Sequence, residues 1–297
     1  MNMPMLQRLT ISKCFVVKEF IRDMVASFRQ NGASLRHLAI ETEGSIIDII
    51  NSCKSLESLH ITMPEYPSSD VLRSSLVDHK ASLRTLALHE TGLDKEREDP
   101  QLSDASELKQ LCEIYPNVHY FGVQITSYDL ETSEWSTGDD SFTRKLEFLA
   151  LMCEFHIVHF RLPTYEFHHH SIHRNGMTDQ SYQAATTNKF QSFCNVVCEW
   201  MGQNKRYLDL NGIVVGHHSY VGPAKSYGRL FDEESVNIQY PRHCFVKDYQ
   251  VNPSGQAEAV AVPVTAQGLR DLEPKCELLD YDPECKWTGG LPGRLRL

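Results

Sequence analysis

The sequence predicts an α/β solenoid in which strand–turn–helix units stack side by side. Two observations indicate this fold class: a Leu-x-x-Leu-x-Ile motif recurs in one frame, and the segments between its copies carry apolar residues at helical spacing. One such unit cannot shield its apolar strand face from water by itself, so the units must stack. The strands then form a parallel sheet on the concave face of a horseshoe, and the helices lie on its convex face.

The motif occurs four times with little variation. It reads Leu6-x-x-Leu9-x-Ile11 in the first copy, and the next three copies begin at Leu35, Leu56 and Leu83. These intervals fall in the range of about 20–29 residues that is typical of leucine-rich repeats. The pattern therefore predicts a leucine-rich-repeat solenoid.

Three looser copies extend the repeat toward the middle of the chain. They are expected at Val118-x-x-Phe121-x-Val123, at Ile157-x-x-Phe160-x-Leu162, and around Leu208-Asp209-Leu210 with Ile213. Their spacing is longer because segments that are charged or polar, and therefore typical of loops, are inserted near residues 93–101, 128–140 and 165–187.

The segments between the motifs predict six helices that cover the sheet. In each of them the apolar residues fall on one helical face. These apolar faces are Phe20, Met24, Val25 and Phe28; Ile46, Ile47, Ile49 and Ile50; Leu72 and Leu76; Leu108, Leu111 and Cys112; Leu146, Leu149 and Cys153; and Phe190, Cys194, Val197 and Met201.

The pattern changes after about residue 220, where prolines separate short apolar runs. We expect residues 1–219 to form the solenoid, and residues 220–297 to form an irregular C-terminal cap that shields the last repeat, followed by a mobile tail. Within the cap, short strands are expected at Cys244–Val246 and Val260–Val264, and one or two helical turns at Thr265–Leu272.

Composition limits the classes of function. The chain has 297 residues, 41% of them hydrophobic, and a net charge of −10, which argues against a nucleic-acid or anionic-lipid surface. No signal-like or membrane-spanning apolar run is found, so an intracellular protein, cytoplasmic or nuclear, is expected. The nine dispersed cysteines are typical of reduced thiols, most of them in the core.

Alternation along the strands predicts a candidate partner-binding surface. If Leu9 and Ile11 point inward, their neighbours point to the concave face, where a protein partner would bind. A solvated sheet face with incidental histidines explains the same pattern, and both interpretations stay open. The residues assigned to this surface are Arg8, His37, Glu41, His60, His89, Tyr120, Gln124, His159 and Arg161.

Other chemistry-bearing residues give weaker signals. His168, His169, His170 and His173 form the densest histidine cluster, and imidazole is a common metal ligand, so a metal-binding protein is the alternative function. No cysteine or carboxylate lies at a familiar ligand spacing there, which favours an exposed loop and leaves no metal ligand assigned. Cys194 and Cys198 share one helical face with apolar neighbours and are expected in the core.

No sequence motif indicates catalysis. The chain has no GxSxG, HExxH, GxxxxGK[ST] or GxGxxG motif. We therefore expect a protein that is not an enzyme and that needs no cofactor.

The first repeat extends to Leu6-x-x-Leu9-x-Ile11-x-x-Cys14, and it resembles the cysteine-containing repeat of F-box/leucine-rich-repeat proteins, the substrate receptors of ubiquitin ligases. Later copies replace the cysteine, as in degenerate fungal-type repeats, and the resemblance covers Met5 to Thr164. It implies that the horseshoe holds a target protein while an F-box binds the ligase adaptor. No F-box is found, because Leu162-Pro163 and Leu291-Pro292 lack the helical pattern that follows the motif's opening. A ligase adaptor is therefore expected as a partner only if an F-box is missing from this chain.

Overall fold

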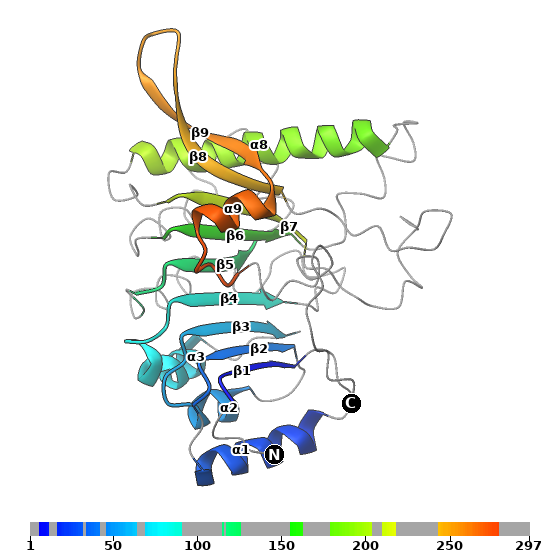
Figure 1. The fold of residues 1–297 in the computed structure, drawn as a ribbon, viewed down its shortest axis with the longest axis vertical. Helices are drawn as coiled ribbons and strands as arrows, with labels where there is room; N and C mark the ends of the chain where they lie inside the picture. Colours follow the sequence, from blue (N-terminus) through cyan, green and yellow to red (C-terminus); the bar gives the residue numbers. More distant parts are fainter. Residues whose placement is uncertain are drawn as a thin grey trace.

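The computed structural model describes residues 6–11, 17–31, 34–41, 46–63, 69–90, 115, 117–125, 155–162, 179–203, 210–217 and 243–278. They form an α/β fold around one nine-stranded sheet, whose strands lie in the order in which they occur in the chain. The first seven strands pair in parallel, and the last two are antiparallel. The expected α/β class with a parallel sheet is confirmed (Figure 1).

The strands and helices have the following bounds. The strands are β1 (Arg8–Ile11), β2 (His37–Glu41), β3 (Ser58–Met63), β4 (Thr85–Glu90), β5 (Tyr120–Gln124), β6 (Ile157–Leu162), β7 (Gly212–His217), β8 (His243–Val251) and β9 (Ala257–Val264). The helices are α1 (Val17–Asn31), α2 (Ile47–Ser52), α3 (Ser69–Leu76), the 3₁₀ helix η2 (Val77–His79), α8 (Asp179–Gln203) and α9 (Ala266–Leu272).

The parallel strands align the apolar pairs of the sequence motif. Leu38 lies beside Leu59 and Ile40 beside Ile61, and Leu59 in turn lies beside Leu86. These side chains are almost fully buried against the helices, since neighbouring residues on a strand point to opposite faces of the sheet. We call this side of the sheet the core face.

A ladder of backbone carbonyls holds the strands in register where they begin. The Gln7 carbonyl accepts hydrogen bonds from the N–H groups of Arg36 and His37, and the Arg36 carbonyl accepts from Glu57 and Ser58. The carbonyls of residues 57, 84, 119 and 156 accept in the same way from the next strand. Each of these six residues follows the first apolar position of a motif copy. Their carbonyls join seven copies in sequence, so the seven copies are placed equivalently.

The predicted frame of the last two copies is wrong. Phe121 pairs with Val158, so the sixth copy reads Phe155-x-x-Val158-x-Phe160 and begins two residues earlier than expected. Val158 pairs with Ile213, so the seventh begins at Leu210. The sixth copy is displaced by two residues, and a strand alternates with period two, so its core-facing residues were still placed on the correct face.

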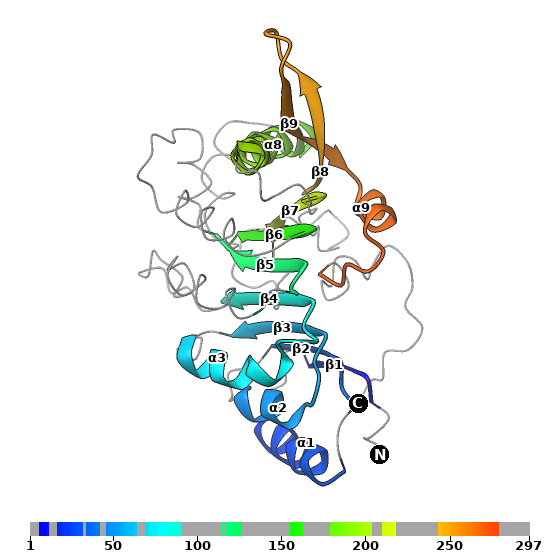
Figure 2. The same ribbon diagram turned by 90° about the vertical axis from the view of Figure 1, so that its left-hand side faces the viewer.

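The helices α1, α2, α3 and α8 pack on the core face. Figure 2 shows α3 and α8 on the same side of the sheet, and residues of α1, α2, α3 and α8 belong to one apolar cluster with the strands. The expected face of α1 needs one correction, because Phe20 is 44% exposed and Ile21 is buried instead. The helix α8 begins at Asp179, so the last part of the expected loop 165–187 is helical.

Several predicted segments lie outside the described residues. These are the two helices around Leu108 and Leu146, the insertions at 93–101 and 128–140, and the C-terminal tail. The division of the chain at residue 220 also stays a prediction.

The C-terminal region is more regular than the sequence indicates. Instead of short runs, β8 and β9 form a long hairpin that continues the same sheet, and the end of the hairpin extends beyond the rest of the ribbon (Figure 1). The helix α8 shields the edge strand β9 at one point: the Ala261 N–H donates to Asn195 Oδ1, and Gln191 Nε2 donates to the Ala261 carbonyl. The backbone of an edge strand is otherwise open to pairing with other chains.

Among the described helices, none has the length and apolarity needed to cross a membrane.

A buried histidine joins two neighbouring units. His79 is 1% exposed, its Nδ1 accepts a hydrogen bond from the Leu56 N–H, and its Nε2 lies 3.2 Å from the Ile50 carbonyl, to which it donates. Only the neutral ring with its proton on Nε2 can make both bonds. Burial lowers the pKa of His79, which favours the same neutral form.

Core packing gives the first testable expectation. Replacing Leu59, which is 0% exposed, with alanine should lower the free energy of unfolding by about 2–5 kcal/mol, because the shortened side chain leaves a cavity. Chemical denaturation followed by circular dichroism measures this change. The matched control is Val71→Ala at a 42% exposed position of α3, where a change below about 0.5 kcal/mol is expected. Equal effects at the two positions would contradict the assigned core face.

Stability should also fall in acid through His79. Its pKa is lowered in the folded state from an ordinary value of 6.5, so the unfolded chain binds this proton more readily. The contribution of neutral His79 to the stability of the folded state is therefore complete above pH 6.5, and it is lost as the pH falls below this value. In His79→Gln, which can accept and donate but cannot be protonated, the free energy of unfolding should vary less with pH over this acidic range. Parallel pH profiles for the two proteins would refute the assignment.

Candidate protein-binding face

The side of the sheet opposite the core face is partly covered by the chain's own C-terminal segment. This segment, residues 265–278, contains α9 and runs back over the sheet. We call the segment the strap, and the side of the sheet that it covers the strap face. In Figure 2, α9 lies on the side of the sheet away from α3 and α8. A second apolar cluster joins the strap to the sheet: Leu269, Cys276 and Leu278 pack with Ala87, Tyr120, Ile157, Val214 and Cys244.

Two of the predicted surface residues are accessible on this face. The Arg8 side chain is 49% exposed and that of His37 is 18% exposed. The predicted exposure is wrong for four others, His60, Tyr120, Gln124 and His159, which are between 2% and 6% exposed. Sequence alternation placed all of these residues on the correct face, but it carries no information on what covers that face.

Three further surface residues are only partly described. Glu41, His89 and Arg161 lie in β2, β4 and β6, and their side chains are outside the part of the chain that the structure describes. Their role in binding stays a prediction.

The strap is anchored by a buried carboxylate that the sequence did not single out. Glu273, at the end of α9, is 9% exposed, and its Oε2 accepts a hydrogen bond from the Tyr120 hydroxyl at 3.0 Å. Its Oε1 accepts from Asn211 Nδ2 and lies 3.2 Å from His156 Nδ1. These partners compensate for the cost of removing a carboxylate from water.

The anchor changes the acidity of its tyrosine. Burial raises the pKa of Tyr120 well above its ordinary value of 10, and the negative charge of Glu273 raises it further. The phenol therefore stays protonated and keeps donating to Glu273. This hydrogen bond ties the strap to β5.

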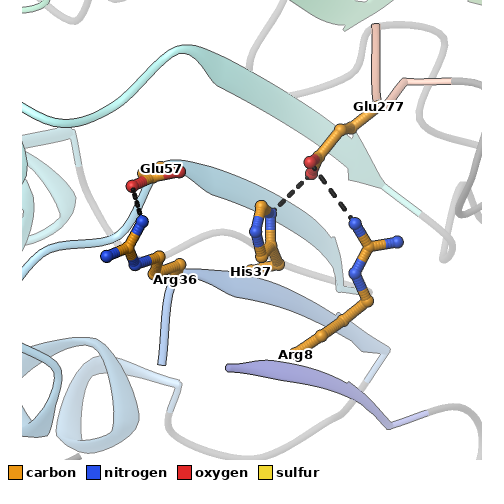
Figure 3. Close-up of polar contacts among 5 residues, drawn as sticks. All are labelled: Arg8, Arg36, His37, Glu57 and Glu277. Carbon is orange, nitrogen blue, oxygen red and sulfur yellow. Dashed lines mark hydrogen bonds and ion pairs between the residues drawn. The ribbon is translucent and has the colours of Figure 1, made fainter. Parts of the chain in front are cut away.

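A second carboxylate of the strap lies over the first two strands. Glu277 Oε2 is 2.7 Å from His37 Nδ1, and Glu277 Oε1 is 3.4 Å from Arg8 Nη2. Figure 3 shows the Glu277 side chain between these two residues, which come from adjacent strands. The neighbouring pair of Arg36 and Glu57, 3.0 Å apart, makes no contact with Glu277 in this view.

The beginning of the strap is fixed by a helix cap. Thr265 lies immediately before α9, and its hydroxyl accepts a hydrogen bond from the Gly268 N–H at 3.0 Å. Such caps satisfy one of the free N–H groups of a first helical turn. Leu269, one residue later, points into the apolar cluster and is 0% exposed.

Two glycines of the sheet make room for the strap. A Cβ at Gly212 would lie 2.6 Å from Leu269 Cδ1 and 3.0 Å from the Phe245 carbonyl oxygen. A Cβ at Gly122 would lie 3.0 Å from Ala87 Cβ and 3.4 Å from Leu278 Cδ2. The sequence shows these glycines inside strands, but it does not show which segment approaches them.

The other candidate sites either lie outside the described residues or are buried. The cluster from His168 to His173 lies outside the described residues, and the described residues contain no group of three potential ligands placed to bind a metal ion. Cys194 and Cys198 are buried in α8 as expected, and burial raises the pKa of both thiols, that of Cys198 to about 12. Both thiols therefore stay protonated and pack as core residues.

No protein-family model matches the chain, and neither the curated proteins nor the solved structures contain a significant match.

The close approach at Gly212 gives a direct test of the strap. Gly212→Ala should lower the free energy of unfolding by about 1–3 kcal/mol, because the new methyl group clashes with Leu269 and the backbone of Phe245. Thermal and chemical unfolding measure the loss.

Two variants show whether the strap causes this effect. In a double-mutant cycle, Leu269→Ala should relieve part of the Gly212→Ala penalty, so the two effects should not add. The matched glycine control is Gly268→Ala in α9, where the nearest atom is 3.4 Å from the new Cβ and better helix propensity should stabilise by up to about 1 kcal/mol. Strict additivity of the first two substitutions would show that Leu269 does not lie against Gly212.

Proposed function

We propose that this chain is a leucine-rich-repeat solenoid that recognises another protein through its strap face. The observation that supports this proposal most strongly is the equivalent placement of seven motif copies, which are joined by six backbone carbonyls that each accept two hydrogen bonds from the next copy. Stacked units of this kind present a long row of strands, and such extended surfaces commonly bind proteins.

The free part of that surface lies at its N-terminal end. The side chains of Arg8 and Thr10 on β1 are exposed, whereas the strap covers Tyr120 and Val214 farther along the sheet. A partner would therefore meet β1 and β2 first. The resemblance to F-box/leucine-rich-repeat proteins favours a role as the substrate-recognition part of a ubiquitin ligase, with the adaptor bound by an F-box outside this sequence.

Site-specific photo-crosslinking tests the binding face. A benzoylphenylalanine introduced at Thr10 should crosslink one protein in a lysate of the native cells. The same crosslinker at Arg22, whose side chain is 73% exposed on α1 on the helical side, should not. Excess unlabelled wild-type chain should abolish the Thr10 adduct, because both chains compete for the same partner.

The outcome separates the scaffold from the ligase role. A competed adduct that is specific to Thr10 supports partner binding on the strap face, and equal adducts at both positions would refute it. If the crosslinked protein also becomes ubiquitylated when the native full-length protein is supplied with ligase components, the receptor role is supported. A specific adduct without ubiquitylation would support binding of a protein partner but would refute the role in a ubiquitin ligase.

A further inference from the structure

We propose that Arg8 and His37 form a carboxylate-binding site for an acidic side chain of the partner, and that Glu277 occupies this site in the absence of the partner. The inference rests on the proposed function of the strap face and specifies the chemistry of the partner. It follows from the unequal way in which the strap's two carboxylates are held.

The first carboxylate is part of the folded core. Glu273 is 9% exposed, accepts hydrogen bonds from Tyr120 and Asn211, and lies 3.2 Å from His156 Nδ1. Removing one hydrogen-bond partner of such a buried group leaves polar atoms unpaired, which is costly. Glu273 therefore anchors the strap to the sheet.

The second carboxylate is only partly buried. The side chain of Glu277 is 19% exposed, against 11% for that of Glu273, and its recorded partners Arg8 and His37 are 49% and 18% exposed. Ion pairs with solvent access contribute little net stability, because water solvates both charges when they separate. The flanking residues Cys276 and Leu278 are buried, so the backbone on either side of Glu277 stays packed against the sheet.

The two partners of Glu277 form a preorganised pair. Arg8 and His37 are direct register partners on β1 and β2, so both side chains leave the same face from positions about 5 Å apart. Each contacts a different oxygen of the carboxylate, as Figure 3 shows. A site that contacts both oxygens from a rigid sheet is specific for the planar carboxylate group.

Charge determines what can replace Glu277. The donors face the strap side of β1 and β2, where the exposed neighbour Thr10 is uncharged. The chain as a whole carries a charge of −10, so an acidic partner gains no general attraction and must be recognised locally. The partner that fits is a protein segment that presents a glutamate or aspartate beside an apolar residue, as the strap itself does.

Competition with Glu277 gives the site a measurable signature. A tethered side chain has an effective concentration in the millimolar range, so an external carboxylate binds the wild-type chain weakly. Glu277→Gln removes the competing charge without shortening the side chain. Affinity for an acidic probe should then rise about tenfold, if the competing carboxylate normally occupies the site for most of the time.

The experiment uses the full chain and a defined probe. The probe is a fluorescein-labelled peptide with the sequence of residues 275–279, in which serine replaces the cysteine at the position of Cys276; a second peptide carries glutamine at the position of Glu277. Fluorescence anisotropy measures binding to wild type and to Glu277→Gln. The matched control is Glu57→Gln, which removes the same charge from the neighbouring ion pair with Arg36.

The expected pattern is specific. The acidic peptide should bind Glu277→Gln about tenfold more tightly than wild type or Glu57→Gln, and the glutamine peptide should show no such gain. Adding Arg8→Gln or His37→Gln to Glu277→Gln should abolish the gain. Circular dichroism and thermal unfolding establish that each variant is folded. If His37→Gln is unstable, Arg8→Gln still tests the site, because the Arg8 side chain is 49% exposed.

Two results would overturn the inference. One is equal affinity of wild type and Glu277→Gln for the acidic peptide, and the other is an equal gain for the glutamine peptide. Crosslinking at Thr10 reports on the proposed function separately. A specific crosslink without carboxylate exchange would show that the partner binds this face through other chemistry, whereas loss of the crosslink would refute the proposed binding face itself.

Discussion

The fold depends on the burial of one apolar row that no single unit can shield from water. Leu38, Leu59 and Leu86 lie side by side across β2, β3 and β4, and each strand brings the next residue of the row into register. Hydrophobic burial is roughly proportional to the area removed from water, so each added strand shields the edge of the one before it. The carbonyl ladder at the strand starts fixes the register, and a shift by one residue would turn every apolar side chain to the other face.

This row also determines what the other face can do. Because the helices occupy the core face, the strap face is the side on which the chain itself or a partner can lie. The chain uses part of it for a second apolar cluster under Leu269, Cys276 and Leu278. The strap therefore occupies part of the surface that, in the proposed function, a partner would also use.

The two carboxylates of the strap show how burial separates structure from recognition. Glu273 and Glu277 are four residues apart, yet one is held by three neighbouring side chains and the other lies at the accessible edge above β1 and β2. A carboxylate that is removed from water is more costly to leave unpaired than one with some solvent access. Glu273 thus anchors the strap, and we propose that the contact of Glu277 is replaceable.

The sequence by itself determined the positions of the first five strands, the alternation of faces along them and the helical burial of residues such as Met24, Phe28 and Cys194, because these follow from local periodicity. It placed His60, Tyr120 and His159 on the correct face but wrongly predicted that they are exposed, and it missed Glu273, Asn211 and His156 as a group. Those features were decided only by the tertiary structure, because Glu273 lies more than 150 residues from Tyr120 in sequence and contacts it at 3.0 Å. Periodicity describes neighbours within one element, whereas the path of a returning segment depends on contacts between distant parts of the chain.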